Sequence, residues 1–166
     1  SLDTEENRDP YRVTMVLQPA AHAFRLPVEA HPRPAIAGLQ TAMVVGPSGQ
    51  EVFTDKHGRV RLQFHWDRRA PGDEGSSCWV RTAVPWSGGG YGAVFVPRIG
   101  QEVVVQFEEG DPDRPVVIGM LYNATNPLPL PPEDLHTKIG IESRSTKGGG
   151  EEDHNRLVLD DAAGAE

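Results

Sequence analysis

The sequence Asp55-Lys-His-Gly-Arg-Val-Arg-Leu-Gln-Phe-His-Trp66 decides the fold of this chain. It opens with a polar turn over residues 55–58, after which apolar and polar residues alternate with a period of two. Alternation of this length predicts a strand with one buried face and one face in water. The apolar series is therefore expected in the core of a barrel: Val60, Leu62, Phe64 and Trp66.

Four further apolar runs, separated by Gly, Pro and Asp, predict the partners of this strand. They are residues 41–45, 78–84, 102–107 and 115–122. Five strands in about 85 residues, all antiparallel by the lengths of their connections, have the size and count of an OB-fold barrel. Gly119 lies within the last run, where we expect a bend of the barrel that a side chain would crowd.

Composition and charge limit the classes of function that the chain can have. The chain has 166 residues, and its 18 glycines and 15 prolines favour short strands, many turns and extended tails. No apolar run approaches the length of a membrane span. The net charge of −8 argues against nucleic-acid binding, because phosphate recognition needs a basic surface. The single cysteine, Cys78, cannot form an internal disulfide, and its place in a strand pattern predicts a buried, inert thiol.

The two ends differ from the barrel. An isolated strand is predicted over residues 11–17, followed by a proline-rich connector, so we expect the end of a preceding domain and a segment of a longer protein. Residues 126–136 form a second proline-rich linker. Beyond it, the polar tail has one apolar triplet, Leu157-Val-Leu159, which cannot bury itself. The tail is therefore either disordered or covered by apolar partners on other chains.

Acidic residues provide the first candidate for chemistry. Paired carboxylates can hydrolyse glycosides or bind a metal ion. Here they lie in a turn that contains Gly110 and Pro112, where acidic residues are what the turn itself favours. A structural role is the preferred interpretation for this cluster, which consists of Glu108, Glu109, Asp111 and Asp113.

Other candidate sites are weaker. The six histidines have no metal-ligand spacing and are His22, His31, His57, His65, His136 and His154. Ser76, Ser77 and Ser87 lack the sequence context of a serine nucleophile. Arg59, Arg61 and Arg81 with Trp79 form a candidate single-strand-binding face. The acidic loops around these arginines favour a solvated or subunit-facing surface instead. We expect no metal, no cofactor and no catalytic residue.

Motifs throughout the chain resemble the VgrG family, the valine-glycine repeat spike proteins of bacterial type VI secretion systems, which are similar to the central spikes of contractile phage tails. The resemblance covers nearly all of residues 33–166. The motifs, in order, are Asp55–Asp67, Ser76–Arg81, Pro85–Trp86, Pro97–Val103, Glu109–Pro115, Gly119–Asn123, Gly140–Gly150 and Asn155–Asp161.

The resemblance implies an all-β homotrimer built from a base, a neck and a needle. Residues 1–36 would end the tail-hub-like base and its connector, and residues 37–125 would form a five-stranded OB-fold neck. After the linker, residues 137–166 would start a trimeric triple-stranded β-helix needle. Leu157 and Leu159 would then point to the three-fold axis and form the needle core.

The resemblance also implies a structural function without catalysis. The trimer would puncture target membranes, touching them transiently, and carry effectors or their adaptors. Its partners would be a tail-tube protein below the base and a PAAR-type tip protein. It would assemble in the bacterial cytoplasm and then be injected outside the cell or into a target cell. Two alternatives remain: an OB module that binds oligonucleotides or oligosaccharides, and an accessory domain of a cell-wall hydrolase.

Overall fold

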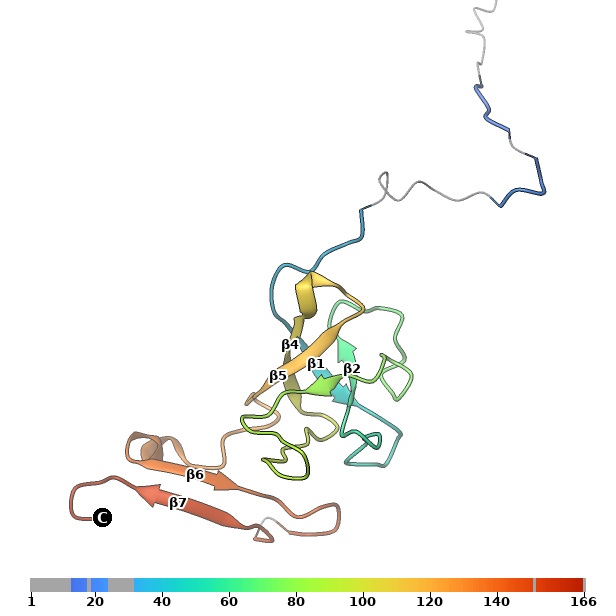
Figure 1. The fold of residues 1–166 in the computed structure, drawn as a ribbon. Helices are drawn as coiled ribbons and strands as arrows, with labels where there is room; N and C mark the ends of the chain where they lie inside the picture. The colour runs from blue at the N-terminus through green and yellow to red at the C-terminus, as the bar shows by residue number, and fades with distance from the viewer. Residues whose placement is uncertain (1–12, 18, 24–31, 151, 166) are drawn as a thin grey trace, which may run out of the picture. The chain divides into compact units, whose positions relative to one another are not determined.

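Five strands form one curled sheet (Figure 1). The computed structural model describes residues 13–17, 19–23, 32–150 and 152–165. The strand order is β2-β1-β4-β5-β3. The strands are β1 (Gln40–Val45), β2 (Arg61–Phe64), β3 (Arg81–Thr82), β4 (Glu102–Phe107) and β5 (Pro115–Leu121). The all-β prediction is confirmed.

The pairing of the strands is mixed. β1 pairs antiparallel with β2 and with β4, and β4 pairs antiparallel with β5. β3, however, pairs parallel with β5, with Arg81 opposite Val116 and Thr82 opposite Val117. The prediction that all strands are antiparallel is therefore wrong. Loop length constrains only strands that follow one another in the chain, and β4 lies between β3 and β5 in sequence.

One residue pair closes the sheet into a barrel. β2 and β3 are the two outer strands, and Val60 and Val80 lie directly before them. The N–H of Val60 donates to the carbonyl of Val80 at 2.9 Å, and the N–H of Val80 donates back at 2.8 Å. Both side chains are fully buried. Because this bridge joins the two outer strands, the sheet curls back on itself and its free edges are paired there.

The core contains three of the four alternating residues of the opening stretch. Val60 and Leu62 are fully buried and Phe64 nearly so, but Trp66 is 54% exposed. The expected core position of Trp66 is thus corrected. β2 ends at Phe64, where the carbonyl accepts the N–H of Asp67 in a turn, so the alternation of faces stops before Trp66. The indole stacks on the outside of the Phe64 ring, with centroids 5.0 Å apart.

The third strand is shorter than predicted. Only Arg81 and Thr82 lie in β3, with Val80 bridged to Val60, and the preceding residues are outside the ladder. Cys78 is exposed, so its predicted burial is wrong. Its run of apolar neighbours belongs to a loop, where no sheet face determines the direction of the side chain.

A β-bulge bends β5. Val104 of β4 lies opposite Gly119, and the next residue, Val105, lies opposite Val117. Ile118 is therefore an extra residue, and a bulge of this kind increases the twist and bend of its strand. A Cβ atom built at Gly119 would meet nothing within 4 Å. The bend is where it was predicted, but crowding is the wrong reason for it.

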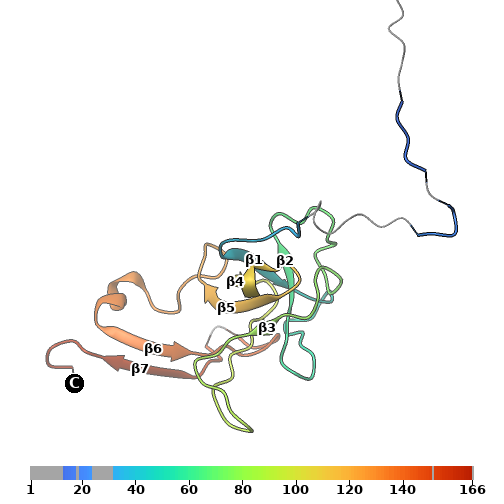
Figure 2. The ribbon, with the colours of Figure 1, turned by 45° about the horizontal axis from the view of Figure 1, so that its top comes forward.

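The carboxyl-terminal part forms a separate hairpin (Figure 2). After the short helix η3 (Pro132–His136), β6 (Lys138–Glu142) pairs antiparallel with β7 (Arg156–Asp160). Hydrogen bonds from Asp161 to Thr137 and from Ser143 to Asn155 extend the ladder at both ends. The first steps of a triple-stranded β-helix were expected here. In the single chain, the described residues of this region form a two-stranded hairpin.

The chain divides into two units, Ser1–Arg33 and Pro34–Glu166. In the first unit, described residues 13–17 form no strand, so the predicted strand is wrong there, and residues 11 and 12 lie outside the described residues. Val16 and Leu17 are almost fully exposed, as expected for a segment without a sheet to join. None of the helices in the described part of the chain has the length and apolarity to cross a membrane.

The alternation in β2 gives a direct test of this barrel. Leu62→Ala should lower the free energy of unfolding by about 2–5 kcal/mol, because it opens a cavity in the core. Trp66→Ala should cost about 1 kcal/mol, mainly from the lost stacking on Phe64. Urea titration of both variants measures the difference. Equal losses would mean that the two side chains share the core and that the observed end of β2 is wrong.

Candidate assembly surface

One face of the hairpin is apolar and uncovered. Ile139 lies opposite Leu159, and Ile141 lies opposite Leu157. Side chains directly opposite one another share a face, and residues two apart along a strand do so as well. All four side chains therefore lie on the same side, and each is 60–65% exposed. We call this surface, formed by Ile139, Ile141, Leu157 and Leu159, the bare face.

The opposite face of the hairpin is covered by the chain itself. Pro129 and Leu130 of the linker line a small hollow together with residues of both strands, among them Gly140, Ile141 and Val158. Val158 is correspondingly only partly exposed. A Cβ atom at Gly140 would lie 2.7 Å from the carbonyl oxygen of Leu157, so only glycine fits this close strand contact. The linker therefore accounts for the partial cover of Val158, while the four side chains of the bare face stay exposed.

Ion pairs mark the covered side. Lys138 Nζ lies 2.7 Å from Asp134 Oδ1 of η3, and Arg156 Nε lies 3.4 Å from Glu142 Oε2 across the two strands. Lys138, Glu142 and Arg156 alternate with the four apolar residues, so their side chains lie on the face opposite the bare face. Such partly exposed pairs near the surface add little stability. Their effect here is to keep charge on one side of the hairpin and leave the other side apolar.

A cluster of charges joins the hairpin to the barrel. Arg98 Nη1 lies 2.6 Å from Glu51 Oε1, and the backbone N–H of Lys147 donates to Glu51 Oε2 at 2.6 Å. Arg98 also donates to the carbonyl oxygens of Arg144, at 2.6 Å, and Ser145, at 3.3 Å. We call this group the Glu51–Arg98 clamp. It ties the loop that follows β6 to two loops of the barrel.

Hydrogen bonds lower the pKa of two carboxyl groups. The backbone N–H of Lys147 and then the guanidinium of Arg98 lower the pKa of Glu51 from its ordinary value of 4.5. The Arg59 guanidinium lowers the pKa of Asp55 from 3.8 to about 2, helped by the amides of Arg59 and His57 and opposed by desolvation. Both groups are therefore charged in the folded protein at neutral pH, where they act as acceptors.

The candidate single-strand-binding face, for which a solvated or subunit-facing surface was the preferred interpretation, is only partly assembled. The Arg61 guanidinium lies over the Trp79 ring, 4.4 Å from its centroid, and donates to the Ser77 carbonyl. Arg59 instead pairs with Asp55 at 2.6 Å, and Arg81 pairs with Glu108. Carboxylates therefore neutralise two of the three arginines, and Arg61 occupies one face of the ring on which a base would stack.

The acidic cluster is part of a turn. Glu108 pairs with both Arg81 and Arg114, and it begins the short helix η2 (Glu108–Gly110). Asp111 Oδ1 accepts the backbone N–H of Asp113 at 3.0 Å, a pattern typical of an Asx turn. The carboxylate of Glu108 thus links β3, η2 and the start of β5. Across the described residues, no group of three or more His, Cys, Asp or Glu side chains is placed to hold a metal ion.

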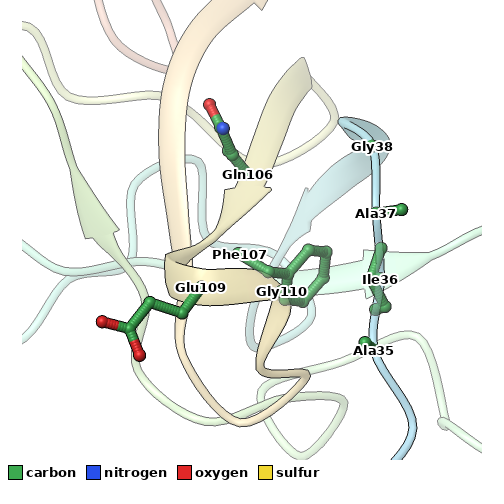
Figure 3. A pocket seen from close by; sticks show the side chains of 8 residues that line it. All are labelled: Ala35, Ile36, Ala37, Gly38, Gln106, Phe107, Glu109 and Gly110. Carbon is green, nitrogen blue, oxygen red and sulfur yellow. The ribbon is translucent and has the colours of Figure 1, made fainter.

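One hollow of the barrel unit, shown in Figure 3, lacks the groups that catalysis needs. It has a volume of about 350 Å³ and lies between residues 35–38 and residues 106–110. The N–H of Ile36 donates to the Gly110 carbonyl at 2.9 Å, which holds the connector beside the end of β4. Glu109 is its one ionisable lining side chain, and Figure 3 shows it directed away from residues 35–38. A single carboxylate provides neither an acid–base pair nor a nucleophile with its base.

Comparison with known proteins identifies the class of the barrel. Residues 50–122 match the family model described as the type VI secretion system/phage-baseplate injector OB domain. This match agrees with the observed five-stranded sheet and confirms the OB-fold prediction. The barrel is therefore an injector OB domain.

Similar proteins extend this assignment to the rest of the chain. The type VI secretion system spike protein VgrG4b of Pseudomonas aeruginosa is 45% identical over all 166 residues, and VgrG1c of the same organism is 48% identical over 89% of the chain. The actin cross-linking toxin VgrG1 of Vibrio cholerae is 45% identical over 83% of the chain. The chain belongs to the VgrG family, and it spans only 20%, 20% and 12% of the lengths of these three relatives.

The Glu51–Arg98 clamp was not predicted from the sequence. The lowered pKa of Glu51 provides a test of whether it forms. A carboxyl group whose pKa is depressed by folding stabilises the fold above its unfolded pKa, and this contribution is lost as the pH falls through the folded value. The amide resonance of Lys147 should therefore titrate with a midpoint below pH 4.5 in an NMR pH series. Glu51→Gln should abolish this titration. A midpoint at or above 4.5 would show that the clamp does not form in solution.

Proposed function

We propose that this chain is the neck of a trimeric spike in a type VI secretion machine and the start of its needle. The observation that carries the proposal is the bare face of the hairpin. Four large apolar side chains lie together in water there, in a chain whose barrel core is otherwise well covered. Contiguous exposed apolar surface of this kind marks a site of association.

Copies of the same chain are the partners that suit this face. An isolated two-stranded hairpin is marginally stable in water, so it gains from further strands or a covering surface. Three hairpins around an axis would bury the Ile139–Leu159 and Ile141–Leu157 pairs against one another. The arrangement would also pair or cover strand edges that one chain leaves open. The linker and the Glu51–Arg98 clamp would hold each hairpin in position for this contact.

The proposed role is mechanical. The barrel closes on itself, the candidate acidic residues belong to a turn, and the hollow beside residues 35–38 has one carboxyl group. Together these observations favour a rigid structural part without catalysis. The tail-tube protein, a PAAR-type tip and effectors or their adaptors are proposed partners of the whole spike, in line with the VgrG family. We propose that it assembles in the bacterial cytoplasm and is then injected, touching the target membrane only in passing.

Charges on the bare face should disrupt assembly. Leu157→Asp combined with Leu159→Asp places six carboxylates around the axis of a trimer, so the trimer should dissociate or lose order at its needle end. Sedimentation velocity of the purified chain measures the change. Ala163→Asp combined with Ala165→Asp adds the same charge beyond β7 and serves as the matched control, which should remain trimeric.

Two results would contradict the trimer proposal. One is a wild-type chain that stays monomeric at every concentration tested. The other is a Leu157→Asp, Leu159→Asp variant that assembles as well as the Ala163→Asp, Ala165→Asp control, since the bare face would then lie outside the interface.

The acidic turn provides a test of the non-enzymatic role. We expect the purified chain to hydrolyse neither peptidoglycan nor nucleotides. Changing Glu108 and Glu109 to Gln, and Asp111 and Asp113 to Asn, should loosen the turn because Glu108 loses its pairing with Arg81 and Arg114. Assembly should survive the change. Hydrolysis by the wild-type chain that disappears in this variant would instead assign the cluster to an active site.

A further inference from the structure

A second apolar surface lies on the loop between β3 and β4. Trp86 is 63% exposed, Tyr91 65% and Val94 82%. In Figure 2 this connection extends away from the sheet, below β3. We call residues 85–96 the aromatic loop. A group of large exposed apolar side chains often marks a surface that a partner covers. Tryptophan and tyrosine are also enriched among the residues that contribute most to binding at interfaces.

The aromatic loop is ordered by its own hydrogen bonds. The N–H of Gly88 donates to the Tyr91 carbonyl at 2.9 Å, and the N–H of Ala93 donates to the Trp86 carbonyl at 2.8 Å. These bonds make a miniature hairpin in which the two rings meet edge to face, with centroids 5.8 Å apart. The rings are thus held in place before any partner arrives, which reduces the entropy lost on binding.

Two glycines make this arrangement possible. A Cβ atom at Gly88 would lie 2.3 Å from Cζ of Tyr91, and one at Gly92 would lie 2.6 Å from the Trp86 carbonyl oxygen. Gly92 also has a φ of 137°, which side chains disfavour. The glycines therefore allow the tyrosine ring to lie over the backbone and present the aromatic pair outward. The loop has the features of a built contact surface.

The charge of the chain indicates which partner fits. No charged residue occurs from Thr82 to Pro97, although charged residues make up 24% of the chain and its net charge is −8. Two acidic copies repel one another least where they meet through a neutral surface. A basic partner such as a polycation would instead be drawn to the acidic surface elsewhere. A second copy of this chain is therefore the occupant that the charge distribution favours.

The position of the loop supports the same partner. Arg98, just after the aromatic loop, hydrogen-bonds the carbonyl oxygens of Arg144 and Ser145 in the loop that follows β6. The end of the aromatic loop is thus fixed to the hairpin that carries the bare face. When bare faces of several copies meet, the same clamp brings their aromatic loops into a defined position relative to that contact.

We propose that the aromatic loop packs against the neck of a neighbouring copy and forms a second contact between protomers. This inference rests on the proposed trimer and adds a contact outside the needle. Assembly then depends on two separated surfaces, so the necks hold together where the two-stranded hairpins alone are marginal. Trp86 and Tyr91 would be its anchor residues.

Replacement of the anchors tests the contact. Trp86→Ser combined with Tyr91→Ser should weaken trimerisation at least about tenfold, as expected when two interface anchors are removed. Trp66→Ser is the matched control, because Trp66 is similarly exposed but lies outside the uncharged segment. It should change the trimerisation constant less than about twofold. Sedimentation equilibrium gives the constants, and circular dichroism verifies that each variant is folded.

Cross-linking tests the contact without removing the rings. Gly89 lies at the loop tip, and a side chain there would meet nothing within 4 Å. In a Cys78→Ser background, Gly89→Cys should cross-link between copies with a short bismaleimide, whereas Glu74→Cys in the loop between β2 and β3 should do so much less. Equal cross-linking of the two would contradict the proposed contact.

The two proposals fail in different ways. A wild-type chain that trimerises, is broken by charges at Leu157 and Leu159, and is unaffected by loss of Trp86 and Tyr91 would overturn only the loop contact. The aromatic loop would then face another macromolecule. A wild-type chain that is always monomeric would overturn both proposals.

Discussion

Closure of the sheet by Val60 and Val80 is the constraint on which the rest of this structure depends. β2 and β3 are short strands, and two backbone hydrogen bonds join their beginnings. The bridge holds because both valines are completely buried among core side chains from the other strands. With the outer strands paired, the barrel can be stable without partners. The aromatic loop and the hairpin lie outside the core of the barrel. They are therefore available for the proposed contacts with other copies.

The hairpin differs from the barrel because a single chain covers only one of its two faces. Pro129 and Leu130 cover one face, and the Glu51–Arg98 clamp holds its far loop. The bare face has no such cover within the described residues, and a two-stranded ribbon has little core of its own. Under the proposed function, order in this region would be coupled to association, because the needle would be formed jointly by several chains.

Features that depend on a local sequence pattern were predicted correctly. A period of two placed Val60, Leu62 and Phe64 together, and the Leu157-Val-Leu159 triplet was recognised as unable to bury itself. The same pattern could not show that the ladder stops before Trp66, because alternation continues past the last hydrogen bond. The parallel pairing of β3 with β5 and the clamp were also missed. Glu51 is 47 residues from Arg98 and 96 from Lys147, separations at which no local signal exists.

Hydrogen exchange as a function of protein concentration is the most direct test of whether the hairpin depends on assembly, since it reports on the amides of the hairpin itself. We expect the amides of β6 and β7 to become more protected as the chain passes from monomer to trimer. Amides of β4, in the closed barrel, should exchange at the same slow rate throughout. Equal protection of β6 and β7 in the dilute, monomeric chain would contradict the proposed dependence of the hairpin on assembly, because the hairpin would then be stable without neighbours.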